Sequence, residues 1–140
     1  MERQNMNDIL KLIPQRSPIV MVDAFLGIED EISRTTLTVR EGNLFVSDGV
    51  LSECGLIEHM AQSAAAREGF VCSRENRAVP IGYIASVNDF SCEALPAVGS
   101  VLQTEVRVVQ QIGALSLIEA ESVVDGRKIA VGKMKIVLEQ

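Results

Sequence analysis

Aromatic and metal-binding side chains are scarce in this sequence, which has no tryptophan, one tyrosine, one histidine and three cysteines. Sites that stack nucleic-acid bases need aromatic rings, so this scarcity argues against them. One histidine, together with cysteines whose spacing matches no zinc motif, also argues against a metal site. We therefore expect no metal and no nucleic acid. Cys54, Cys72 and Cys92 are expected to be reduced thiols of a cytoplasmic protein.

Basic charge and long apolar runs are also in short supply. Thirteen lysines and arginines face 19 aspartates and glutamates, for a net charge of −6, which disfavours nucleic acid and anionic membrane surfaces. No uncharged run exceeds 11 residues, too few for a membrane span, and the first ten residues lack the apolar stretch of a secretory signal. The 140 residues, 47% of them hydrophobic, instead suit one domain over residues 1–140 with a substantial core.

One helix dominates the predicted structure. Apolar side chains recur at helical spacing at Ile57, Met60, Ala61, Ala64 and Ala65. Ser52 is a suitable N-cap and Gly69 lies near the expected end, so the pattern predicts a helix over 52–68. Few charges lie on its other faces, and we therefore expect protein to enclose it.

Strand patterns surround this helix on both sides. Two strands are predicted before it, at 19–28 and 31–41, and four after it, at 81–92, 100–111, 114–124 and 127–138. Asp125-Gly126 is the strongest hairpin signal, and Asn5 or Asn7 could cap a short first helix that Pro14 stops. This order predicts an α+β hot-dog fold, an antiparallel sheet wrapped around one long central helix. Strand 81–92 is the expected sheet edge, which two chains could share as a dimer.

Glu58 is the first candidate for chemistry. It lies in an apolar stretch of the helix, where desolvation favours the protonated acid and suits proton donation. Gln62 follows it at i+4 and can meet it on one face, so the pair could also be a simple polar contact. His59 is the only histidine, but it points about 100° away from Glu58, which makes a dyad within one chain geometrically poor. A histidine bonded to a nearby backbone group or a partner subunit is the alternative.

The start of the helix and several arginines offer weaker signals. The backbone amides of Glu53 and Cys54 could hold a developing oxyanion, whereas a nucleophilic Cys54 would lack a base. Asp23 is expected to be buried and paired, with Arg16 as a candidate partner. The remaining cluster of basic charge could receive an acidic partner or simply be solvated; it consists of Arg67, Arg74 and Arg77.

Two motifs resemble a known family, the hot-dog 3-hydroxyacyl-[acyl carrier protein] dehydratases. The segment IPQRSPIVMVD at 13–23 resembles that family's entry segment, in which Pro-His-Arg, one residue and Pro precede an apolar strand and Asp. The segment IEHMAQSAAA at 57–66 resembles its catalytic-helix motif, and the strand order also matches. The wording Ile-Glu-His-Met-Ala-Gln looks most like the predicted dehydratases of aryl-polyene pigment pathways.

The resemblance implies site residues and partners. It places the catalytic carboxylate at Glu58, the carbonyl-polarising amides near Glu53 and Cys54, and the substrate on the phosphopantetheine arm of an acyl carrier protein, with no further cofactor. The family's catalytic histidine, 14 residues before the carboxylate, falls on Leu44, and Phe45 matches the following residue; both would contact substrate. Family sites lie between two chains, so a homodimer or higher oligomer is implied.

The leucine at the histidine position leaves three functions open, because removing a general base typically costs about 10²–10⁴-fold in rate. The chain could be a divergent dehydratase in which His59 or water replaces the base. It could be a weak or inactive partner in a heteromer with a homologous dehydratase. It could instead be a hot-dog thioesterase in which Glu58 directs a water onto the thioester.

Overall fold

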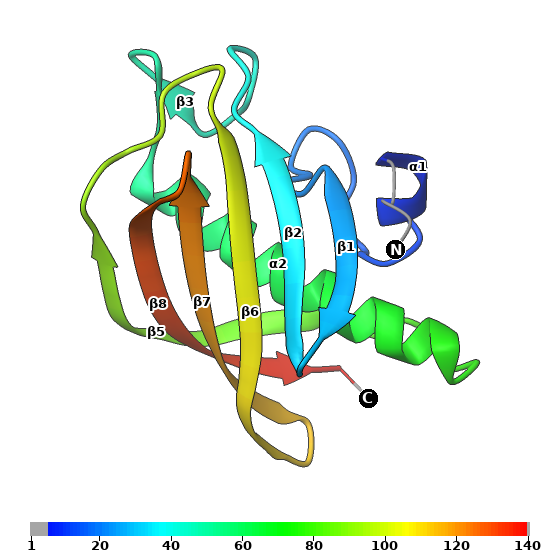
Figure 1. The fold of residues 1–140 in the computed structure, drawn as a ribbon. Coiled ribbons are helices and arrows are strands. Elements are labelled where there is room, and N and C mark those ends of the chain that lie inside the picture. The colour runs from blue at the N-terminus through cyan, green and yellow to red at the C-terminus, as the bar shows by residue number, and fades with distance from the viewer. Residues whose placement is uncertain (1–5, 140) are drawn as a thin grey trace.

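A computed structural model describes residues 6–139 as a curved sheet with one long helix on its concave side (Figure 1). Six strands form an antiparallel sheet in the order β1-β2-β6-β7-β8-β5, and β3 and β4 form a separate short pair. The elements are α1 (Met6–Ile9), β1 (Ala24–Glu29), β2 (Ile32–Thr38), β3 (Val46–Ser47), β4 (Val50–Leu51), α2 (Glu53–Arg74), β5 (Gly82–Cys92), β6 (Val101–Ile112), β7 (Leu115–Val124) and β8 (Arg127–Leu138).

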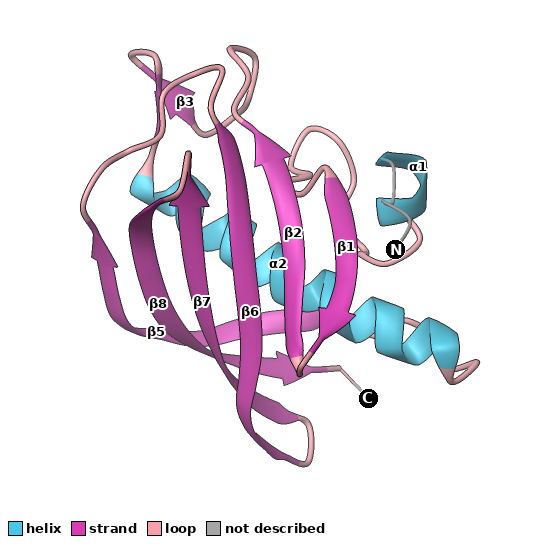
Figure 2. Ribbon diagram, viewed as in Figure 1, coloured by secondary structure: helices cyan, strands magenta, loops and turns pink. Residues whose placement is uncertain are grey.

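The predicted hot-dog architecture is confirmed. Figure 2 shows α2 running across the hollow of the sheet, with β6, β7 and β8 curving around it. Leu56 and Met60 of α2 are fully buried and belong to one core cluster with inward-facing residues of the sheet such as Val106, Ile118 and Met134. Burial of these side chains holds the helix against the concave face.

The long helix begins as predicted and ends later. Ser52 caps it, because its hydroxyl oxygen accepts a hydrogen bond from the amide of Gly55 at 3.1 Å. The helix passes through Gly69 and continues to Arg74. A β-carbon at Gly69 would lie 1.9 Å from the carbonyl oxygen of Leu12, so this glycine allows a close approach of the N-terminal segment instead of ending the helix.

The N-terminal predictions need correction. The first strand starts at Ala24 and not at residue 19, because Ile19 and Met21 hydrogen-bond to the side chain of Gln62 on α2. The first helix ends at Ile9, short of Pro14, and Asn7 lies inside it, so Asn7 is not its cap. The alternative cap, Asn5, lies outside the described residues.

The C-terminal strands lie close to their predicted positions. Asp125 and Gly126 join β7 to β8 with φ angles of 49° and 78°, as a tight hairpin turn requires. Strand β5 is an edge of the sheet, as expected, and pairs only with β8 among the described strands. The predicted loop at 41–50 contains β3 and the first residue of β4.

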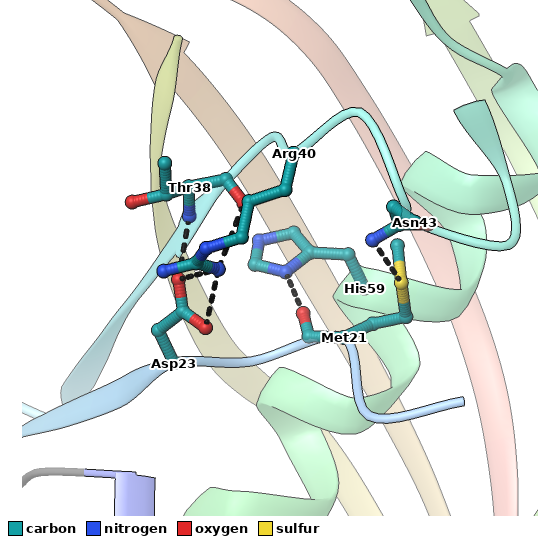
Figure 3. A network of polar contacts seen from close by, with 6 residues as sticks. All are labelled: Met21, Asp23, Thr38, Arg40, Asn43 and His59. Atoms are coloured by element: carbon teal, nitrogen blue, oxygen red, sulfur yellow. Dashed lines mark hydrogen bonds and ion pairs between the residues drawn. The ribbon is translucent and has the colours of Figure 1, made fainter. Parts of the chain in front are cut away.

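Asp23 is paired, but with a different arginine from the one expected. Its carboxylate accepts a hydrogen bond from the amide of Thr38 at 2.7 Å and forms an ion pair with Arg40 at 3.0 Å (Figure 3). Arg16 instead donates to the carbonyl oxygens of Ile13 and Gln15, close to it in the chain. The pairing of Asp23 therefore fixes the start of β1 to the end of β2.

Candidate functional site

A pocket of about 240 Å³ lies between α2 and the strands β5 to β8. Aliphatic side chains from the helix and from the inner face of the sheet form most of its wall, including Ala61, Ala65, Ile84, Val108, Ile118 and Ile136. Its lining residues with polar groups are Gln15, Glu58, Arg67, Glu68, Tyr83 and Ser116. An apolar pocket with few polar groups is typical of a small-molecule site.

Glu58 and Gln62 meet on one face of α2, as their spacing predicted. Nε2 of Gln62 donates to Oε1 of Glu58 at 2.9 Å and to the carbonyl oxygen of Ile19 at 2.7 Å. Oε1 of Gln62 accepts from the amide of Met21 at 2.6 Å, and Gln62 is fully buried. Among the described residues, Oε2 of Glu58 has no hydrogen-bond partner, which leaves one carboxylate oxygen for a ligand.

His59 lies away from this pocket, inside the core. Its Nδ1 is 2.6 Å from the carbonyl oxygen of Met21 (Figure 3), and its Nε2 is 2.6 Å from Oγ1 of Thr104. A carbonyl only accepts, so Nδ1 carries the proton and Nε2 accepts from Thr104. Burial lowers the pKa of His59 to about 4 and so favours the neutral ring. This geometry matches the alternative expectation, a histidine bonded to a nearby backbone group.

The residues expected near the start of the helix occupy a different region from the pocket. Glu53 and Cys54 are exposed in the first turn of α2, where helix geometry leaves backbone amides unpaired. Phe45 packs against the core, and a β-carbon at Gly55 would lie 2.7 Å from its Cβ. Leu44 is 60% exposed. Within one chain, Leu44 does not line the pocket that contains Glu58.

The three arginines of the predicted basic cluster each have a local partner. Arg77 pairs with Glu75, the guanidinium of Arg74 lies over the ring of Phe70, and Arg67 donates to the carbonyl oxygen of Glu31 at 3.0 Å. Arg67 also reaches the pocket wall. The cluster is therefore only partly free to receive an acidic surface.

Between residues 6 and 139, no three His, Cys, Asp or Glu side chains gather closely enough to hold a metal ion. In the same part of the chain, no helix has the length and hydropathy needed to cross a membrane.

Sequence reasoning missed Met21, Thr104 and Ser122, which surround the buried histidine. Oγ of Ser122 lies 2.7 Å from Oγ1 of Thr104. The sequence did contain a signal for the two hydroxyls. Buried and exposed residues alternate along β6 and β7, and Thr104 and Ser122 fall at buried, inward-facing positions. Inward hydroxyls need partners, which pointed to a polar side chain on the helix.

An antiparallel sheet wrapped around one central helix is the hot-dog fold, and here the helix also carries a carboxylate beside an apolar pocket. Residues 7–139 match the ApeP-like family, described as ApeP dehydratase, and the chain belongs to this family. It is thus a hot-dog dehydratase-family protein of the aryl-polyene type, as the motifs implied.

Two bacterial dehydratases are similar to this chain over nearly its whole length. The 3-hydroxyacyl-[acyl-carrier-protein] dehydratase FabZ of Lactococcus lactis subsp. cremoris (strain MG1363) is 27% identical over 139 residues, which cover 96% of this chain and 94% of that protein. FabZ of Streptococcus sanguinis (strain SK36) is 26% identical over 141 residues, covering 97% and 99%.

Solved structures share the fold. The dehydratase heterocomplex ApeI:P from Xenorhabdus doucetiae superposes with a TM-score of 0.87 at 22% identity, covering 94% of this chain and 91% of that chain. A hypothetical thioesterase protein from Streptococcus pneumoniae TIGR4 is more distant, with a TM-score of 0.63 at 13% identity and coverage of 81% and 86%.

Proposed function

We propose that this chain takes part in the dehydration of a 3-hydroxyacyl thioester carried on the phosphopantetheine arm of an acyl carrier protein. The observation that carries the proposal is the Glu58 carboxyl, oriented by Gln62 at an apolar pocket. Membership of a dehydratase family supports the reaction class. The arm comes with the substrate, and loss of water involves no net oxidation or reduction, so the reaction needs no redox cofactor.

The chemistry divides into two proton transfers. A base removes a proton from C2, the C2 electron pair forms the C2–C3 double bond, and the C3–O bond breaks. Glu58, in its protonated form, gives its proton to the departing hydroxyl, which leaves as water and yields the trans-2-enoyl thioester. The backbone amides of Glu53 and Cys54 lie away from the Glu58 pocket of their own chain. In a two-chain site they would face the acid of the other subunit and polarise the thioester carbonyl, which makes the C2 proton more acidic.

The base is the missing part, and we propose that a second subunit supplies it. Leu44, at the family's histidine position, cannot take a proton, and both ring nitrogens of His59 are engaged in the core. The heterocomplex described for the structurally similar ApeI:P supports a heteromer with a homologous dehydratase. In such an assembly this chain contributes Glu58, and its activity alone would be weak or absent.

Assembly through the sheet edge would join the two subunits. Ile84 and Val87 of the edge strand β5 are 40% and 37% exposed, although both face the helix side of the sheet. Pairing of two β5 edges, in a homodimer, a higher oligomer or a heteromer, would cover them and place the two α2 helices side by side. The acidic carrier would then dock at a local patch that includes Arg67.

The purified chain should be assayed alone and mixed with a homologous dehydratase subunit, with 3-hydroxyacyl-carrier substrates. We expect enoyl product from the mixture and little from the chain alone. Strong activity of the chain alone would overturn the partner role but keep the dehydratase. Release of a free thiol in place of an enoyl product would point to the thioesterase and contradict the proposal.

A further inference from the structure

We infer that His59 is a positioning residue for Glu58. It acts on Glu58 through the backbone of Met21 and the side chain of Gln62. The inference rests on the proposed role of Glu58 as the acid. His59 does not line the pocket and would not touch substrate, so its contribution would be to the orientation of the carboxyl group.

Three consecutive hydrogen bonds connect the histidine to the acid. Nδ1–H of His59 donates to the carbonyl oxygen of Met21 at 2.6 Å, and the amide of Met21 donates to Oε1 of Gln62 at 2.6 Å. Nε2 of Gln62 then donates to Oε1 of Glu58 at 2.9 Å. His59 and Gln62 lie one helical turn apart on α2, so together they grip both backbone polar groups of Met21.

The direction of each bond is determined by its partners. A backbone carbonyl only accepts and a backbone amide only donates, so Oε1 of Gln62 must face Met21. Its NH₂ group is then left for Ile19 and Glu58. If Met21 shifted, only the carbonyl oxygen of Ile19 would still hold the NH₂ group of Gln62 in place, so the amide could turn over more easily and point its oxygen at the Glu58 carboxyl. His59 therefore helps to keep a donor on the acid.

We call the three hydrogen bonds from His59 to Glu58 the relay. The His59 end of the relay is held in the centre of the sheet. Because Nε2 of His59 accepts from Thr104, the hydroxyl of Thr104 must in turn accept from Ser122. All three side chains are fully or almost fully buried, on α2, β6 and β7. The burial that lowers the pKa of His59 keeps the ring neutral, so Nδ1 stays a donor and Nε2 an acceptor near neutral pH.

The position of Met21 is also held from the loop that carries Leu44. Nδ2 of Asn43 donates to Sδ of Met21 (Figure 3), and the two atoms are 3.2 Å apart. Met21 thus connects the residue that orients Glu58 with the loop next to the family's histidine position. A change in the relay would therefore alter the orientation of the Glu58 carboxyl without any change in the apolar side chains that line the pocket.

The test compares two replacements of His59 in the assembly that is competent for dehydration. His59→Phe keeps the ring but removes the donor to Met21, whereas the side-chain NH₂ of His59→Asn can replace Nδ1–H. We expect His59→Phe to lower kcat at least about 10-fold with KM within about 2-fold, because misplacement of a catalytic group costs rate more than binding. His59→Asn should recover most of that loss.

Two comparisons separate positioning from general destabilisation. Ser63→Ala removes two buried hydrogen bonds of α2, one with Thr35 at 2.7 Å and one to the backbone carbonyl of His59 at 2.8 Å. Neither involves the His59 ring, so kcat should be unchanged. In a Gln62→Leu background, His59→Phe should cost no further activity, because the two residues act in series. Fully additive effects of the two substitutions, or equal loss of kcat in Ser63→Ala, would overturn the inference.

A readout without turnover distinguishes this inference from the proposed function. The side-chain amide protons of Gln62, followed by NMR, should be protected from exchange in the wild type and in His59→Asn but not in His59→Phe. Should His59→Phe fail to fold, Thr104→Val tests the relay from the sheet and should also weaken that protection. Unchanged protection and unchanged kcat would refute the role of His59. Full turnover of Glu58→Gln would instead refute the proposed function, whatever the amide protons show.

Discussion

Neighbouring residues on α2 have opposite environments. Glu58 lines the pocket and leaves one carboxylate oxygen unpaired among the described residues, whereas His59 is enclosed with both ring nitrogens bonded. Successive helix positions differ by about 100°, which is enough to separate a chemical face from a core face. The same divergence was the reason to doubt a Glu58–His59 dyad from sequence.

Because His59 is buried as a neutral ring, we expect the folded protein to lose stability at acidic pH. Burial lowers the pKa of His59 from 6.5 to about 4. Between pH 6.5 and pH 4 the ring is therefore protonated in the unfolded chain and neutral in the folded chain. Because protonation then stabilises only the unfolded chain, the free energy of unfolding is unaffected by His59 above pH 6.5 and falls as the pH drops towards 4. The total loss is about 3 kcal/mol, at 1.36 kcal/mol for each pKa unit. Urea unfolding over this pH range measures it.

His59→Asn is the control for this prediction, because the amide does not titrate. Carboxyl groups titrate in both proteins, so the difference between the two stability curves isolates the histidine. The stability of the wild type should fall more steeply than that of His59→Asn between pH 6.5 and 4. Parallel curves would show that the ring is not held neutral.

The spacing of residues in the sequence was sufficient to predict the contact between Glu58 and Gln62, but not the contacts of His59. Glu58 and Gln62 are four residues apart, and their contact follows from helix geometry. The partners of His59 are Met21 and Thr104, which are 38 and 45 residues away. Contacts over such separations depend on the register of the folded sheet and on the path of the N-terminal segment, which local patterns do not encode.

At the scale of elements, the strength of local turn signals decided which strands were predicted well. The hairpin between β7 and β8 was placed correctly because Asp125 and Gly126 tolerate positive φ angles. The N-terminal segment had the composition of a strand over 19–28, but part of its backbone bonds to Gln62 instead of a neighbouring strand. A side chain that replaces a strand partner cannot be recognised from apolar periodicity.

The close packing of the N-terminal segment on α2 predicts a sharp effect at Gly69. A β-carbon there would meet the Leu12 carbonyl oxygen at 1.9 Å, and this atom is backbone that cannot turn aside. Gly69→Ala should therefore destabilise the protein by roughly 1–3 kcal/mol, as overpacking does, despite the better helix propensity of alanine. Thermal unfolding measures the change.

Gly42 provides the matched control. A β-carbon at Gly42 would have nothing within 4 Å, so Gly42→Ala should leave the melting temperature nearly unchanged. A Gly69→Ala protein as stable as the wild type would mean that the Leu12 segment does not rest on the helix.

For the whole molecule, the edge strand predicts self-association or association with a homologue. Val87→Lys places a charge on the β5 edge and should weaken assembly, because lysine opposes edge pairing. Ile112→Lys is the control, since Ile112 is 62% exposed but lies at the end of β6, which β7 and β8 separate from β5. Light scattering at micromolar concentration should show an oligomer for the wild type and the control. A wild-type monomer, with and without a homologous subunit, contradicts this assembly.

The missing base makes a second prediction about the assembled molecule. If the two-chain site survives in outline, Leu44 lies opposite the Glu58 of the other chain. Leu44→His should then create or raise dehydratase activity in the chain alone, because the acid and the helix-start amides are already present. If His59 had taken over as base, Leu44→His would add little and His59→Asn would abolish an existing activity.

The role of Glu58 as the acid is tested most directly by the rate at which the competent assembly that contains Glu58→Gln forms the enoyl thioester. Glutamine keeps the shape of the side chain and can still contact Gln62, but it has no carboxyl proton to give. We expect kcat to fall at least about 100-fold, the low end for loss of an acid–base group, with the assembly intact. A rate equal to that of the wild type would contradict this role of Glu58 and place the chemistry elsewhere.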